Sequence, residues 1–222
     1  MIYINRFNLC FVRIPKNASS SVMDYIYSEI CDETDRVSRA FEWDDSQYRK
    51  VYHVNMPPLP HSHVDAKFAI ENGIAPASAR FYGIVRQPFE RQLSLYLYRQ
   101  LGGRYENPPS IEEFRSKLVD GVLQDKPQQM QPQHTFLEYS DPIDAHWWVL
   151  DNIVEHLREF SNTYGGNIKN FKHLNRSPGQ KNELVDLFYT SHLKQEVRRA
   201  YEKDFELYER TCNLHGIRPR AY

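Results

Sequence analysis

The chain has 222 residues, which fits a single domain over residues 1–222, although length alone does not exclude two small domains. Its 28 lysine and arginine residues face 29 aspartate and glutamate residues, and the net charge of -1 excludes a global attraction to nucleic acid or to anionic membranes. Aromatic residues make up 14% of the chain, enough for a packed core, which excludes a disordered protein. Any anion-binding site must therefore be built locally.

The cysteines of the chain, Cys10, Cys31 and Cys212, show no CxxC or zinc-type spacing. Neither a disulfide framework nor a structural metal site is indicated. No run of about 18 apolar residues occurs, and the first residues read as a strand. We therefore expect a cytoplasmic protein with no metal site, no signal peptide and no transmembrane segment.

The first predicted elements are a strand, a loop and a helix. Residues 7–14 (FNLCFVRI) form an apolar, β-prone run, and apolar residues then recur at helical spacing at Val22, Met23, Ile26 and Ile30. The polar stretch 32–50 shows weak periodicity. Residues 56–63 (MPPLPHSH) are too rich in proline for a helix or a central strand, so they predict a loop.

The middle of the chain repeats this order. Residues 80–88 (RFYGIVRQP) read as a strand that ends in a basic residue and a proline suited to a first helical turn. The helix that follows has apolar residues four apart, at Phe89, Leu93, Leu97 and Leu101. Ser110 and Glu113 form a capping-box pattern before another helix. The stretch from Gln124 to Pro142 is rich in glutamine and proline and predicts a loop or lid.

The last elements extend the alternation. Residues 146–151 (HWWVLD) predict another buried strand, followed by a helix that carries Ile153, Leu157 and Phe160. A long amphipathic helix then carries Leu193, Val197, Tyr201, Phe205 and Tyr208. Alternating strands and helices predict an α/β protein with a central, mostly parallel sheet flanked by helices. Ligands of such sheets bind beyond the carboxyl ends of the strands.

One candidate site follows the first predicted strand. The loop from Pro15 to Ser21 places Lys16 beside short hydroxyl side chains at a helix start, where backbone N–H groups can hold a phosphate. It lacks the GxxxxGK[ST] pattern of an ordinary nucleotide triphosphatase. Two interpretations remain open: an anion site, or a helix capped by Ser19 or Ser20 beside a solvated lysine.

A second candidate site follows the strand of residues 81–85. Arg86 at its end can hold a phosphate through its planar guanidinium, and Ser94, about two helical turns later, could bond the same group. In the alternative interpretation, Arg86 forms an ion pair with Glu90 and Ser94 has no role.

Three stretches carry a resemblance to a known family: IPKNASSSV, HSHVDAKFAI and GIVRQPFERQLSLYLY. In this order they resemble the sulfotransferases that modify carbohydrates, most closely the uronosyl 2-O type and its small microbial and viral relatives. Weaker similarity extends to HLNRSPG (173–179) and YEKDFELYE (201–209). The resemblance implies a P-loop-like three-layer fold and the sulfate donor 3′-phosphoadenosine 5′-phosphosulfate, PAPS.

The resemblance also implies roles for individual residues. The 5′-phosphosulfate would be held by the first motif, through Lys16, Asn17, Ala18, Ser19, Ser20 and Ser21. The 3′-phosphate would be held by Arg86 and Ser94, with Arg176 in a loop near the nucleotide. The chain departs from the family pattern at Ala18, Ser20 and Gln87, where Gly, Thr and Asp are usual. Because Ala lacks the freedom of Gly at positive φ, a strained turn at Ala18 is not expected.

Sulfuryl transfer needs a base that takes the proton of the acceptor hydroxyl. The resemblance assigns this role to His63, with His61 as a supporting or acceptor-contacting residue. Two alternatives stay open from the residues alone: half of a metal site, or loop histidines without a role. We expect in-line attack without a metal, with Lys16 stabilising charge on the leaving phosphate oxygen.

The remaining candidates are weaker. Arg176 and Lys181 could contact the nucleotide or be ordinary surface charges. Trp147 and Trp148 could stack on a ring, but their apolar neighbours favour the core. Position alone suggests that Gln133 and His134 touch the acceptor.

The leading hypothesis is a PAPS-dependent enzyme that sulfates a hydroxyl, with a saccharide as its acceptor and no nucleic acid partner. One alternative is a non-catalytic nucleotide-binding module, against which His63 speaks because such a module needs no base. Another is a P-loop-like small-molecule kinase, against which the missing Walker A pattern speaks.

Overall fold

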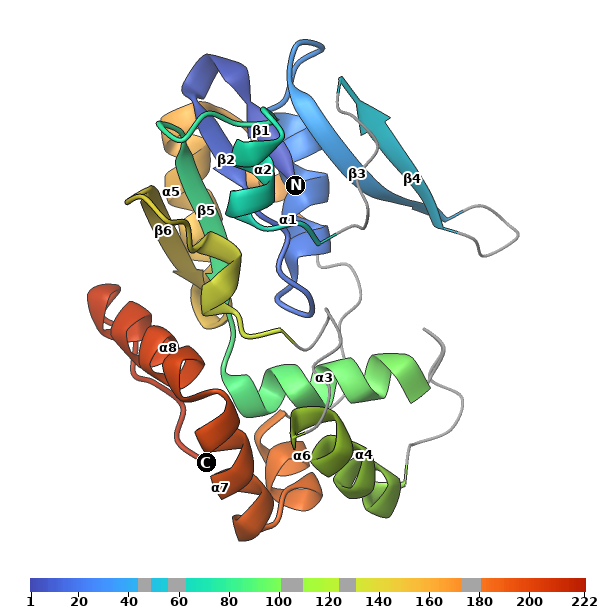
Figure 1. The fold of residues 1–222 in the computed structure, drawn as a ribbon. Coiled ribbons are helices and arrows are strands. Elements are labelled where there is room, and N and C mark those ends of the chain that lie inside the picture. Colours follow the sequence, from blue (N-terminus) through green and yellow to red (C-terminus); the bar gives the residue numbers. More distant parts are fainter. Residues whose placement is uncertain (44–48, 56–62, 101–109, 124–130, 173–180) are drawn as a thin grey trace. The chain divides into compact units, whose positions relative to one another are not determined.

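The computed structural model describes residues 1–43, 49–55, 63–100, 110–123, 131–172 and 181–222. The described residues form two compact units, each made of two stretches of chain (Figure 1). The first unit combines Met1–Ile84 with Thr135–Asn175, and the second combines Val85–His134 with Arg176–Tyr222. The division into two units does not decide whether they act as one domain, so the expectation of one domain over residues 1–222 stays a prediction.

The first unit contains a sheet that has, among the described residues, six strands in the order β4-β3-β1-β2-β5-β6. These are β1 (Ile2–Ile4), β2 (Leu9–Phe11), β3 (Arg36–Trp43), β4 (Arg49–Val54), β5 (Arg80–Val85) and β6 (Asp144–Val149). The pair at the core of the sheet, β2 and β5, is parallel, with Cys10 opposite Phe81. The β1–β2, β1–β3 and β3–β4 pairs are antiparallel, so the expected parallel character is found at the core and not in these pairs.

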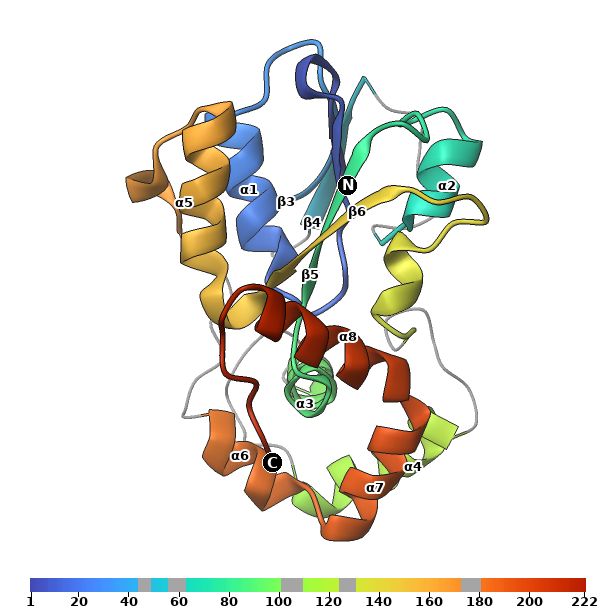
Figure 2. The same ribbon diagram turned by 90° about the vertical axis from the view of Figure 1, so that its left-hand side faces the viewer.

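Alternate residues of the central strands face two different cores, as the two-residue period of a strand requires. Leu9, Phe11 and Ile84 belong to the core shared with α1 (Ser19–Glu29) and α5 (Ile153–Tyr164). Cys10 and Phe81 belong to the core shared with α2 (Ala66–Glu71) and the 3-10 helix η3 (His134–Leu137). Figure 2 shows α1 and α5 on one side of the sheet and α2 on the other. The α/β class and the three-layer arrangement are confirmed for this unit.

Three further short 3-10 helices are described in the first unit: η1 (Asn5–Phe7), η4 (Leu150–Asn152) and η5 (Ile168–Asn170). The predicted strand at residues 7–14 is shorter in the structure, where β2 covers Leu9–Phe11. The β3–β4 pair lies within the stretch that showed weak periodicity, and it was not predicted. The strand predicted at 146–151 is β6, but it covers Asp144–Val149, and only Trp148 and Val149 are buried in it. The helix predicted after it is confirmed as α5.

The second unit is helical. Its helices are α3 (Pro88–Gln100), α4 (Ile111–Leu123), α6 (Lys181–Phe188), α7 (Ser191–Ala200) and α8 (Glu202–Leu214). They share a core rich in aromatic residues, in which Phe89 packs edge-on against Tyr189 and Phe205. The helix predicted after Ser110 is confirmed as α4, and the Glu113 N–H donates to Ser110 Oγ at 3.3 Å, which is one of the two hydrogen bonds of a capping box.

The long helix predicted through Leu193 and Tyr208 is wrong, because the structure divides it into α7 and α8. The break lies at Tyr201, whose φ of -126° and ψ of 29° leave the helical region. The helical spacing of apolar residues survives the break because Tyr201 and Phe205 both stay buried in one core. None of the helices in the described part of the chain has the length and apolarity needed to cross a membrane.

Candidate active site

The loop between β2 and α1 is built from left-handed backbone. Lys16 has a φ of 66° and Ala18 a φ of 55°, although neither is glycine. The expectation that Ala18 would not support a strained turn is therefore wrong. A left-handed residue with a Cβ costs about 1–2 kcal/mol, so the surrounding structure must hold this turn in place.

The hydroxyls of Ser19 and Ser20 in this loop form hydrogen bonds with the chain before it. Ser19 Oγ donates to the Ile14 carbonyl oxygen at 2.8 Å, and Ser20 Oγ accepts from the Arg13 guanidinium at 3.0 Å. Ala18 is the N-cap of α1, and its side chain makes no capping hydrogen bond. The interpretation in which Ser19 or Ser20 merely caps the helix is wrong. An uncapped helix start next to a left-handed residue turns successive N–H groups toward one side, as anion-binding loops do.

Burial alternates along the loop. Asn17, Ser19 and Ser21 are buried, whereas Lys16, Ala18 and Ser20 are half-exposed. The Ser21 N–H already donates to the Ala18 carbonyl oxygen at 3.0 Å. The charged side chain of the loop, that of Lys16, is therefore among those that solvent can reach.

Asn17 fastens the loop to the neighbouring strand. Its carboxamide donates to the carbonyl oxygen of Ile84 at 2.5 Å, and both residues are fully buried. Because β2 and β5 are parallel neighbours, their carboxyl ends share one edge of the sheet. The loop after β2 is therefore bonded to the end of β5, and Arg86 follows Ile84 by two positions in the chain.

His63 is half-exposed and lies against the chain that leads into the loop. Its Nδ1 is 3.1 Å from the carbonyl oxygen of Arg13, which is the residue whose guanidinium donates to Ser20. A carbonyl oxygen only accepts, so Nδ1 donates and the neutral ring carries its lone pair on Nε2. That tautomer suits a base. Asp65, which caps α2 by accepting from the Phe68 N–H at 2.7 Å, fixes the chain just after His63.

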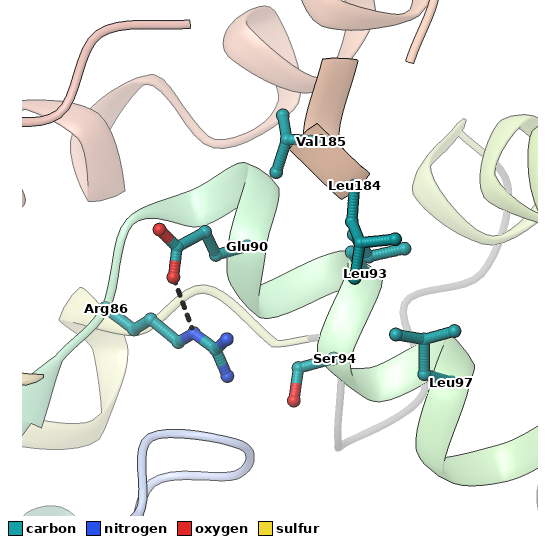
Figure 3. A pocket seen from close by; sticks show the side chains of 7 residues that line it. All are labelled: Arg86, Glu90, Leu93, Ser94, Leu97, Leu184 and Val185. Atoms are coloured by element: carbon teal, nitrogen blue, oxygen red, sulfur yellow. Dashed lines mark hydrogen bonds and ion pairs between the residues drawn. The ribbon is translucent and has the colours of Figure 1, made fainter. Parts of the chain in front are cut away.

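In the second unit, Arg86 and Ser94 line the same pocket. The pocket is partly open to solvent, and Figure 3 shows the Arg86 guanidinium and the Ser94 hydroxyl directed toward the same space. Its other lining residues are Glu90, Leu93, Leu97, Leu184 and Val185. The expected ion pair also exists, with Arg86 Nε 3.4 Å from Glu90 Oε2. The ion pair of the alternative interpretation is therefore present, and the binding of a phosphate by Arg86 stays a prediction.

Glu90 is a buried carboxylate that interacts with two further residues besides Arg86. Its Oε1 accepts from the guanidinium of Arg220 at 2.5 Å and from the Tyr222 hydroxyl at 2.6 Å. Burial and the hydrogen bond to Glu90 raise the pKa of Tyr222 above its ordinary value. The side chain of Gln87 accepts a hydrogen bond from the Glu90 N–H at 3.2 Å. No motif pointed to Arg220, because 130 positions separate it from Glu90.

Other predicted residues fall in different places. His61 and Arg176 lie outside the described residues, as does the side chain of Lys181. Trp148 is buried in the core with α1 and α5, as predicted, and Trp147 packs against the opposite core. Gln133 is fully buried, and its carboxamide bonds to the main chain of Arg86, which the sequence did not suggest.

Lys16 belongs to the first unit and Arg86 to the second, so their convergence on one ligand stays a prediction. Among the described residues, no group of three His, Cys, Asp or Glu side chains is arranged to hold a metal ion.

Comparison with known proteins gives the chain a family. Residues 1–209 match the model of the sulfotransferase family, and the match includes residues of both units. Comparison with curated proteins and with solved structures gave no match. Since the family model spans most of the 222 residues, the chain belongs to the sulfotransferase family, whose members are enzymes that transfer sulfuryl groups.

Proposed function

We propose that this enzyme transfers the sulfuryl group of PAPS to a hydroxyl of a saccharide, and that its two units act as one sulfotransferase domain. The observation that carries the proposal is the loop after β2, with its left-handed Lys16 and Ala18 and the uncapped start of α1. The side-chain bond from Asn17 to Ile84 fastens this loop to the strand that leads directly to Arg86. Two candidate anion sites thus follow two parallel neighbouring strands.

The donor has two anionic ends, and the candidate residues divide between them. The 5′-phosphosulfate is assigned to Lys16 and to the loop residues Asn17–Ser21, of which Ser21 already uses its N–H for the Ala18 carbonyl oxygen. The 3′-phosphate is assigned to Arg86 and Ser94, which line one pocket. The resemblance adds Arg176, which lies outside the described residues. A planar guanidinium beside a hydroxyl suits the oxygens of a phosphate monoester.

His63 is the proposed base, and His61 supports it. Nε2 of His63 takes the proton of the acceptor hydroxyl while the acceptor oxygen forms a bond to sulfur. The bond between sulfur and the bridging phosphate oxygen breaks, and the electron pair stays on that oxygen. Lys16 stabilises this developing charge, and a single donor aimed in this way can contribute about 3 kcal/mol. The products are a sulfate ester and adenosine 3′,5′-bisphosphate.

Calorimetric titration tests the donor assignment. We expect adenosine 3′,5′-bisphosphate to bind the wild type and to bind Arg86→Ala at least tenfold more weakly, because the guanidinium would be lost from a charge-assisted hydrogen bond. ATP is the comparison ligand. ATP affinity equal to that of the bisphosphate, and insensitive to Arg86→Ala, would favour a kinase.

The base assignment is tested with radiolabelled PAPS and a panel of polysaccharides and simple alcohols. We expect His63→Ala to keep the affinity for adenosine 3′,5′-bisphosphate while transfer falls about 100-fold or more. His192→Ala, at an exposed histidine of α7, is the matched control and should transfer as the wild type does. An active His63→Ala enzyme would move the role to another residue.

A further inference from the structure

The side chain of Gln133 forms hydrogen bonds with both main-chain polar groups of Arg86. Its Oε1 accepts from the Arg86 N–H at 2.9 Å, and its Nε2 donates to the Arg86 carbonyl oxygen at 2.9 Å. Gln133 itself is fully buried. This is the pairing that a neighbouring strand would otherwise supply, and it fixes the position of the Arg86 peptide groups at the end of β5.

Gln133 is in turn held by a buried carboxylate of α8. Asp204 is fully buried, and it accepts from the Gln133 N–H at 2.8 Å and from the His134 N–H at 3.0 Å. It also pairs with His134 Nδ1 at 2.7 Å. Three hydrogen bonds to one buried carboxylate compensate for its removal from water, so this arrangement is costly to break.

The same segment is held from α3 by a buried arginine. Arg91 donates to the carbonyl oxygen of Gln131 at 2.9 Å. Burial lowers the pKa of Arg91, and the negative charge of Asp204 acts in the opposite direction. The segment 131–134 therefore lies between a buried cation on α3 and a buried anion on α8, and neither group has a role in the proposed chemistry.

We propose that Gln133 and Asp204 are positioning residues that set where the Arg86 guanidinium lies and thereby determine selectivity for a ribose 3′-phosphate. The inference rests on the proposed function. Glu90 orients the tip of the Arg86 side chain, but the origin of that side chain is fixed by Gln133. Misplacing a functional group by about 1 Å can lower its effect up to 100-fold. Loss of the hydrogen bonds from Gln133 to Arg86 should therefore weaken the binding of the 3′-phosphate.

The test compares two ligands that differ by the 3′-phosphate alone, adenosine 3′,5′-bisphosphate and adenosine 5′-monophosphate. Gln133→Met keeps the side-chain length and removes both hydrogen bonds to Arg86. We expect the preference for the bisphosphate to fall about tenfold in this variant, with the monophosphate affinity changed less than about twofold. Gln195→Met, at an exposed glutamine of α7, is the matched control and should keep the wild-type preference.

Asp204→Asn is the second variant, because it keeps the shape of the side chain and loses one acceptor. We expect its preference for the bisphosphate to fall about threefold, and it decides the test if Gln133→Met does not fold by circular dichroism. A wild-type enzyme that does not prefer the bisphosphate would contradict the proposed function itself. If the variants keep the wild-type preference, or lose affinity for both ligands equally, the positioning role is overturned and the proposed function still stands.

Discussion

The carboxamide of Asn17 donates a hydrogen bond of 2.5 Å to the carbonyl oxygen of Ile84, which joins the loop after β2 to the end of β5. Both residues are fully buried, so water cannot replace the donor if it is removed. Leaving a buried carbonyl unsatisfied costs about 1–3 kcal/mol. We expect Asn17→Ala to lower the free energy of unfolding by about 2 kcal/mol in urea titrations.

The control for this change is Asn72→Ala. The Asn72 carboxamide also donates to a carbonyl oxygen, that of Phe68 at 2.9 Å, but this bond is exposed. Water can replace it, and we expect a loss within about 0.5 kcal/mol. Equal losses at the two positions would mean that the bond from Asn17 adds nothing to the stability of the loop.

Ala18→Gly should stabilise the protein, unlike most substitutions by glycine. Removing the Cβ at a φ of 55° relieves about 1–2 kcal/mol of left-handed strain, while the more flexible unfolded chain offsets about 0.4–1 kcal/mol. The net gain expected in the free energy of unfolding is about 0.5–1 kcal/mol, measured by urea titration.

Ala200→Gly is the comparison, because Ala200 lies in the last turn of α7 and does not have a positive φ. There the same change should cost about 1 kcal/mol, the ordinary helix penalty of glycine. A destabilised Ala18→Gly would show that the left-handed turn is not strained in the folded protein.

The sequence was informative where neighbours in the chain are also neighbours in space. The order of strand, loop and helix around Lys16 follows from apolar spacing within about 25 residues, and so does that around Arg86. The shared pocket of Arg86 and Ser94 follows from helix periodicity, since eight positions amount to about two turns.

Features that depend on distant residues could not be predicted in this way. The break at Tyr201 leaves the apolar spacing intact, because the residues on both sides pack into one core. The Asp204 carboxylate just after the break is used by Gln133 and His134, 71 and 70 positions earlier. The antiparallel pairings of β1 could not be predicted either, because a strand of three residues, Ile2–Ile4, is too short to show a period in its sequence.

Ser94→Ala should weaken the binding of adenosine 3′,5′-bisphosphate without changing that of adenosine 5′-monophosphate. A single neutral hydrogen bond contributes about 0.5–1.5 kcal/mol, which corresponds to about a two- to tenfold loss of affinity. Calorimetric titration with both ligands measures it. Ser116→Ala, at an exposed serine of α4, should bind both ligands as the wild type does. Equal weakening of the two ligands by Ser94→Ala would remove Ser94 from the 3′-phosphate site.

Cys10 should make the protein less stable at alkaline pH. Its side chain is fully buried in β2, and burial raises the pKa of the thiol from its ordinary value of 9.0 to about 12. Above pH 9 the unfolded chain loses this proton while the folded protein keeps it. The folded state then binds more protons, so stability falls as pH rises, by about 1.4 kcal/mol per pH unit until the folded pKa is reached.

The measurement is a comparison of wild type and Cys10→Ala by urea titration at pH 8 and pH 10. Burial also raises the pKa of Cys31 and of Tyr201 to about 12, but both groups are present in the two proteins and cancel in the comparison. The stability advantage of the wild type over the variant should therefore shrink by about 1.4 kcal/mol between the two conditions. An advantage that stays the same at both pH values would mean that the Cys10 thiol ionises in the folded protein as readily as in the unfolded chain.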